Sequence, residues 1–69
     1  MIATEQEINM VLEEIKKNGG VTIRNLSLSI KMNMQKLYFI LGVLLERKKI
    51  TLKKVGNSYA IFSNDKQKQ

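Results

Sequence analysis

The sequence contains no cysteine, histidine, proline or tryptophan among its 69 residues. Without cysteine or histidine, neither disulfides nor an ordinary zinc site can stabilise a chain this close to the lower size limit for a self-supporting core. An enzyme with this sequence would also lack histidine, the commonest general base, and cysteine, the strongest nucleophile. The composition therefore predicts a domain held by aliphatic packing, with no catalytic residue, no bound metal and no cofactor.

Several kinds of functional segment are missing as well. No apolar run approaches the ~20 residues that span a bilayer, and the N-terminus lacks the basic-then-apolar layout of a signal peptide. The adjacent Glu13 and Glu14 point about 100° apart on a helix and cannot share a site. Gly19-Gly20 is better explained as a helix end than as a phosphate loop. We expect a cytoplasmic protein that is not an enzyme and has neither a membrane partner nor a small-molecule ligand.

Positive charge is concentrated after the N-terminal segment of a chain whose net charge is +6. Residues 1–17 carry four acids against two lysines, whereas residues 18–62 carry eight lysines or arginines against Glu46 alone. Such a basic body suits a polyanionic partner, because lysine and arginine release counterions from a phosphate backbone. A solvated, lysine-rich surface explains the same charges, so charge alone leaves both interpretations open.

The first segment has the pattern of an amphipathic helix. Thr4 and Glu7 have the spacing of a capping box, in which each side chain bonds a backbone N–H at the helix start. Four apolar residues then recur on one face: Ile8, Val11, Leu12 and Ile15. Asn18-Gly19-Gly20 is expected to end this helix, since glycine adopts the left-handed conformation of a helix C-terminus.

Two further helices joined by a three-residue turn are expected next. Val21 is predicted to form a short strand or extended segment, and Thr22 to cap a helix. The inner face of that helix carries Ile23, Leu26 and Ile30. Lys31-Met32-Asn33 is predicted to be the turn, with Met32 pointing inward and Asn33 capping the third helix.

The third helix should run from Met34 to about Arg47, followed by a hairpin. Its predicted inward stripe, flanked by Tyr38, comprises Leu37, Leu41, Leu44 and Leu45. Residues 50–53 alternate with a period of two, as a half-buried strand does. Gly56-Asn57-Ser58 is a hairpin turn signal before a return strand over residues 59–62.

This order of elements predicts an α+β fold, a winged helix-turn-helix with three helices and a C-terminal two-stranded β wing. A short third strand at Val21 would extend the wing sheet. We expect residues 1–62 to form one domain and residues 63–69 a flexible polar tail.

The third helix also carries a narrower resemblance. The run from Leu37 to Leu44 is similar to a small bacterial winged-helix family of unassigned function, with its leucine-tyrosine pair, leucine-glycine pair and further leucine. That family commonly has glycine where this chain has Lys31 and Lys48. The resemblance implies the winged-helix fold and leaves the activity unassigned.

Double-stranded DNA is the partner that this fold suggests. The second helix of a helix-turn-helix enters the major groove with its N-terminal residues against base edges. Glutamine can bond adenine there, and lysine can approach guanine. The candidate DNA-contacting residues are Gln35 and Lys36 at base edges, with Arg24, Lys53 and Lys54 near phosphates. Solvated surface charge is the alternative for each cation.

The outer face of the third helix supports a different partner. It is nearly apolar, with Phe39 and Val43 at the centre of the predicted outward face, and such a helix is normally buried on more than one side. Gly42 would let another backbone approach closely. The candidate dimer-interface residues are Leu28, Phe39, Ile40, Gly42 and Val43. A homodimer, with or without DNA binding, therefore stands beside the DNA hypothesis; an exposed Val43 and a Phe39 under the wing are the alternative.

Overall fold

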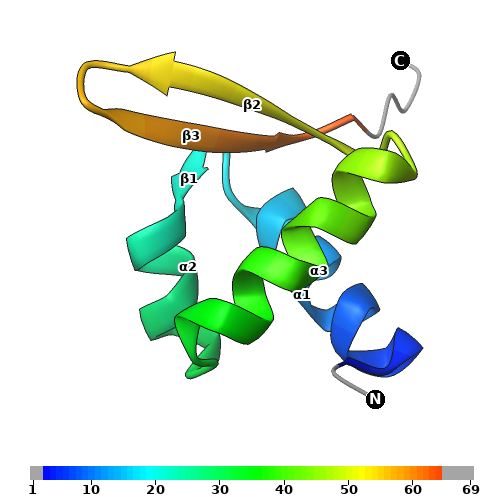
Figure 1. Cartoon of the computed structure of the whole chain (residues 1–69). Helices are drawn as coiled ribbons and strands as arrows, with labels where there is room; N and C mark the ends of the chain where they lie inside the picture. Colours follow the sequence, from blue (N-terminus) through cyan, green and yellow to red (C-terminus); the bar gives the residue numbers. More distant parts are fainter. Residues whose placement is uncertain (1–2, 65–69) are drawn as a thin grey trace.

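A computed structural model describes residues 3–64 of the chain and contains three helices and a three-stranded antiparallel sheet (Figure 1). The elements in chain order are α1 (Glu5–Lys17), β1 (Val21–Thr22), α2 (Ile23–Ile30), α3 (Met34–Glu46), β2 (Ile50–Val55) and β3 (Ser58–Ser63). The predicted α+β order is confirmed, including the short strand at Val21.

Side-chain caps begin all three helices at the predicted residues. The Thr4 hydroxyl accepts the Glu7 backbone N–H at 3.1 Å, and the Glu7 carboxylate accepts the Thr4 backbone N–H at 3.0 Å, which completes the capping box. Thr22 and Asn33 cap α2 and α3 by accepting a backbone N–H at 3.2 and 2.9 Å. Each cap satisfies a backbone donor that the helix leaves without a partner, so these polar residues fix where the helices begin.

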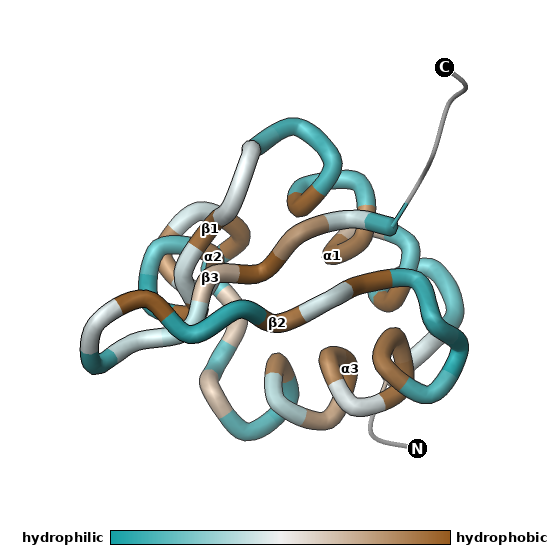
Figure 2. The backbone as a smooth tube through the Cα atoms, turned by 90° about the horizontal axis from the view of Figure 1, so that it is seen from above, coloured by the Kyte–Doolittle hydropathy of each residue, from teal (hydrophilic) through white to brown (hydrophobic). Residues whose placement is uncertain are grey.

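The sheet has the order β1-β3-β2, so β3 is its central strand. Val21 and Leu52 both pair with Ile61, one from each side. The helices lie below one face of this sheet, and the tip of the β2–β3 hairpin extends past them on the side of α2 (Figures 1 and 2). The wing is therefore partly anchored over the core and partly projecting.

The sheet also extends beyond the predicted C-terminal boundary of the domain. Ser63 is the last residue of β3, and the Asn64 backbone N–H donates to the Lys49 carbonyl at 2.8 Å. These two residues, which the sequence analysis assigned to a tail, are held to the start of β2. The rest of the predicted tail, residues 65–69, lies outside the described residues.

The core is aliphatic throughout. Its buried members are Ala3, Ile8, Val11, Ile15, Val21, Leu26, Met32, Leu37, Ile40, Leu41, Leu44, Ile50, Ala60 and Ile61. The inward position of Met32 is confirmed, whereas one member of the predicted α3 stripe is wrong: Leu45 is 40% exposed and Ile40 is fully buried. Because α3 is apolar on most of its circumference, its hydrophobic pattern alone does not fix which face turns inward.

None of the four aromatic side chains lies in this core. Tyr38, Phe39 and Tyr59 are all about half exposed, and Phe62 is partly buried. Aromatic rings ordinarily dominate the burial energy of a domain. A chain that leaves three of them at the surface gains little stability from them, so their position needs another explanation.

Four backbone positions in the connections have a positive φ: Gly20, Lys31, Lys48 and Gly56. Helix α1 ends in an extended Asn18, contrary to the prediction of a left-handed glycine at its end, and Gly20 takes the positive φ (92°) instead. Lys31 and Lys48 have φ of 54° and 60°, the left-handed conformation that glycine adopts most readily. Lysine pays a steric cost there that glycine would not.

Gly20 is the glycine whose replacement we expect to be costly. A Cβ at this position would lie 2.7 Å from the Phe62 ring, in a conformation that L-residues rarely adopt. We predict that Gly20→Ala lowers the free energy of unfolding by about 1–3 kcal/mol in urea titrations. Gly19→Ala is the matched control, because nothing lies within 4 Å of its Cβ position. Equal stability of the two variants would contradict this explanation.

Candidate nucleic-acid interface

A groove of about 340 Å³ lies between the starts of α2 and α3 and the wing. Its walls are formed by Thr22, Ile23, Arg24, Met34, Tyr38, Ser58 and Tyr59. Four elements contribute to it, namely β1, α2, α3 and β3, and the caps Thr22 and Asn33 fix the two helix starts beside it. The groove thus exists only in the folded chain, and it contains both tyrosines of the sequence.

Strand alternation decides which wing residues face this groove. Ile50 and Leu52 pack toward the core, so Lys54 shares their face of β2, as does its β3 partner Tyr59. Lys53 and its partner Ala60 lie on the opposite face. The structure therefore separates the two lysines that the sequence analysis treated as one pair.

The charge along the groove is positive. Arg24 is an exposed residue in the first turn of α2, and no carboxylate lines the groove. Six cations make no ion pair within residues 3–64: Arg24, Lys31, Lys48, Lys49, Lys53 and Lys54. An anionic ligand would therefore meet no repulsive group in the groove walls.

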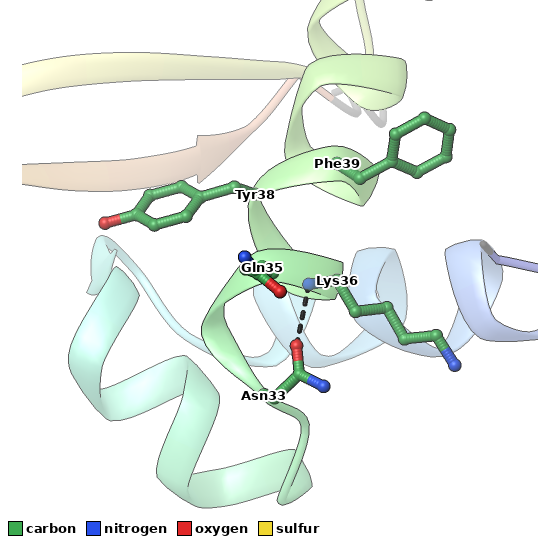
Figure 3. A pocket seen from close by; sticks show the side chains of 5 residues that line it. All are labelled: Asn33, Gln35, Lys36, Tyr38 and Phe39. Carbon is green, nitrogen blue, oxygen red and sulfur yellow. Dashed lines mark hydrogen bonds between the residues drawn. The ribbon is translucent and has the colours of Figure 1, made fainter.

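The first two turns of α3 border a second, larger recess of about 500 Å³ (Figure 3). Tyr38 and Phe39 leave α3 in opposite directions, with Gln35 between them (Figure 3). Lys36 extends along α1, and its Nζ lies 2.7 Å from the Glu7 carboxylate. Lys36 is therefore held away from the outer surface by an ion pair 29 residues distant in sequence.

Acidic residues of α1 form ion pairs with Lys36 of α3 and with Arg47, the residue that follows α3. The Arg47 guanidinium donates to both carboxylate oxygens of Glu5, at 3.0 and 2.7 Å. The hydrogen bond from Arg47 lowers the pKa of Glu5, and the bond from Lys36, followed by the Thr4 backbone bond, lowers the pKa of Glu7. Both carboxylates therefore stabilise the fold at neutral pH, and this contribution is lost as the pH falls through the lowered pKa values.

The candidate DNA-contacting residues divide between two surfaces. Arg24 lines the groove, Lys54 shares the wing face of Tyr59, and Gln35 lies exposed on α3. Lys36 lines the same recess as Gln35, with its ammonium bound to Glu7, and Lys53 lies on the opposite face of β2 from Lys54. Tyr38 and Tyr59 line the groove but were not among the predicted contact residues. The available signal was that Tyr59 alternates with Ile61 on a strand long enough to extend past the core.

The candidate dimer-interface residues are only partly exposed together. Leu28 and Phe39 are exposed, and open space lies over Gly42. Ile40 is fully buried, so its assignment to an exposed interface is wrong, and Val43 is partly buried against the core. The buried face of α3 is wider than the predicted stripe, because α3 contacts both α1 and the sheet.

Within residues 3–64, no three His, Cys, Asp or Glu side chains come together in a group that could hold a metal ion. None of the helices in that range combines the length and the apolar character needed to cross a membrane.

The arrangement of helices and wing is found in a solved structure, that of a viral Zalpha domain bound to left-handed Z-DNA. The two superpose with a TM-score of 0.71 and 23% sequence identity, over 88% of this chain and 91% of the viral one. The chain has a winged helix-turn-helix fold. No protein family and no curated protein matches the sequence, so the narrower bacterial resemblance stays a prediction.

In winged-helix terms, α2 and α3 are the helix-turn-helix and the β2–β3 hairpin is the wing. The groove then lies where the helix-turn-helix meets the wing, bounded by α3, the start of α2 and β3. This is the surface that combines the first turn of the second motif helix with wing residues.

Proposed function

We propose that this chain is a non-enzymatic, cytoplasmic DNA-binding domain that acts in transcription or in DNA organisation. The observation that carries the proposal is the groove itself, in which Arg24 and two half-exposed tyrosines meet with no carboxylate. The structural similarity to a domain solved with DNA bound supports a nucleic-acid partner. The fold alone would not indicate a nucleic-acid partner, because winged-helix domains serve several functions.

The contacts in this proposal follow from the position of each side chain. The start of α3 approaches the major groove of double-stranded DNA, where the exposed Gln35 can bond the edge of adenine. Arg24 and Lys54 flank this helix start and bind phosphates, which fix the orientation of the domain without reading sequence. Lys36 contributes little as long as Glu7 holds its ammonium.

The distribution of acids supports the same surface. The four glutamates of α1 each bond a cation, namely Lys16, Lys17, Lys36 or Arg47. Negative charge is therefore concentrated on α1 and neutralised there, while the groove and the wing keep their positive charge. DNA is expected to approach the groove side of the molecule rather than α1.

We predict that Lys54→Ala weakens duplex binding about two- to fivefold at 50 mM salt, because an exposed charge contact contributes roughly 0.5–1 kcal/mol. The slope of log Kd against log salt should also become shallower by about 0.9, one phosphate contact. Fluorescence anisotropy of a labelled duplex measures both quantities.

Lys53→Ala is the matched control, since it removes the same charge from the opposite face of the same strand. It should leave the affinity nearly unchanged. Equal losses of affinity in the two variants would mean that the wing attracts DNA through its overall positive charge and that Lys54 makes no specific phosphate contact. Failure of the natural chain to bind duplex at 50 mM salt would contradict the proposed function itself.

A homodimer is the second candidate function, as an interaction module or as the DNA-binding form. The observation that favours it is the apolar strip on the outer face of α3, where Phe39 and Leu45 are 44% and 40% exposed beside the open position of Gly42. Leu28, the other exposed candidate, lies on α2. Phe39 and Tyr38 point apart, so a dimer centred on Phe39 is compatible with an open groove (Figure 3).

We predict for this candidate that Phe39→Glu converts the chain from dimer to monomer in light scattering, because an unpaired charge would be buried at the interface. Val55→Glu is the control, being a similarly exposed apolar residue near the tip of the wing. A natural chain that stays monomeric at high concentration would eliminate the dimer.

A further inference from the structure

We propose that the groove between Tyr38 and Tyr59 receives an unstacked nucleobase, so that the chain prefers single-stranded DNA, or duplex with an extruded base, over intact duplex. The inference rests on the proposed function and names the form of nucleic acid that the same surface recognises. It is carried by the aromatic and polar composition of the groove.

The two tyrosines are the groove's main recognition surface. Tyr38 is 54% and Tyr59 48% exposed, one on a rigid helix and the other on the wing, while Met34 and Ile23 form apolar wall between them. Aromatic rings bind nucleobases by stacking on their faces. In an intact duplex those faces are covered by neighbouring bases, and only the edges are accessible. Two half-exposed rings at one groove therefore match an unstacked base better than a duplex edge.

The polar groups around the rings complete the match. Arg24 lies at the α2 side and Lys54 on the same wing face as Tyr59, so a nucleotide with its base in the groove has cations available for its phosphates. The Thr22 and Ser58 hydroxyls in the walls can donate to or accept from the edge of a base. The groove thus offers an aromatic face, edge partners and a positive rim.

A second copy of the chain is a poorer occupant of this groove. Symmetric docking would bring Arg24 and Lys54 of one copy toward the same cations of the other, with no carboxylate in the groove walls to balance them. A phosphate-bearing ligand supplies the missing negative charge. The apolar strip around Phe39, on the other side of α3, lacks this cationic rim.

Intrinsic fluorescence tests the proposal directly, because the chain has two tyrosines, both in the groove, and no tryptophan. Three ligands of one sequence are titrated at 50 mM salt: a single-stranded 12-mer, its intact duplex, and the duplex with one bulged base. We expect the single strand and the bulged duplex to quench tyrosine emission and to bind more tightly than the intact duplex.

Matched variants separate stacking from charge. Stacking of one base changes affinity by roughly 5- to 150-fold, so Tyr59→Leu should weaken binding of the single strand at least fivefold and weaken binding of the intact duplex by a smaller factor. Tyr59→Phe keeps the ring and should retain the affinity. Phe39→Leu removes a ring outside the groove and should change neither. Tyr38→Leu provides a second test from the other wall, and thermal melts establish that each variant is folded.

The outcomes distinguish this inference from the proposed function. Salt-dependent binding of the intact duplex without tyrosine quenching, and without tighter binding of the single strand, would overturn the inference and leave DNA binding in place. No binding of any of the three ligands would overturn both.

Discussion

The structure depends on packing α1 and α3 against one face of a small sheet through aliphatic side chains alone. Ile61 on the central strand is fully buried and pairs with both Val21 and Leu52, so the sheet is joined at the residue that the helices cover. A domain of 69 residues without disulfide bonds has a free energy of unfolding of only a few kcal/mol. Each element therefore turns its best apolar face to this core, and the outer face of α3 and the wing are left for other contacts.

Local chemistry made much of the fold predictable. Thr4, Thr22 and Asn33 are caps whose hydrogen-bond partners lie three residues away. Local sequence is therefore enough to predict them. The hairpin follows from alternation around Gly56-Asn57. The orientation of α3 was not predictable, because a helix that is apolar almost all round does not reveal which face packs. Ile40 and Leu45 were exchanged for that reason, since only the positions of α1 and the sheet decide between them.

The candidate site was predictable only in part, because it is made by contacts between distant residues. Arg24, Gln35 and Lys54 were found from the fold pattern, while the Glu7 that holds Lys36 lies 29 residues away and could not be inferred. Tyr38 and Tyr59 meet at one groove through the packing of α3 below the wing. Half-exposed tyrosines in a chain whose core contains no aromatic ring are the feature that gives this surface its chemistry: a positive rim around stacking faces.

The most direct test of this account is an NMR titration of the ¹⁵N-labelled chain with DNA at low salt. The account predicts that backbone amides of Arg24, Gln35, Lys54 and Tyr59 shift together and saturably, while those of Glu14, Asn18 and Ser29 on the acidic side of the molecule do not move. Shifts confined to α1, or spread evenly over the lysine-bearing surface, would contradict the claim that the groove between helix-turn-helix and wing is the nucleic-acid interface.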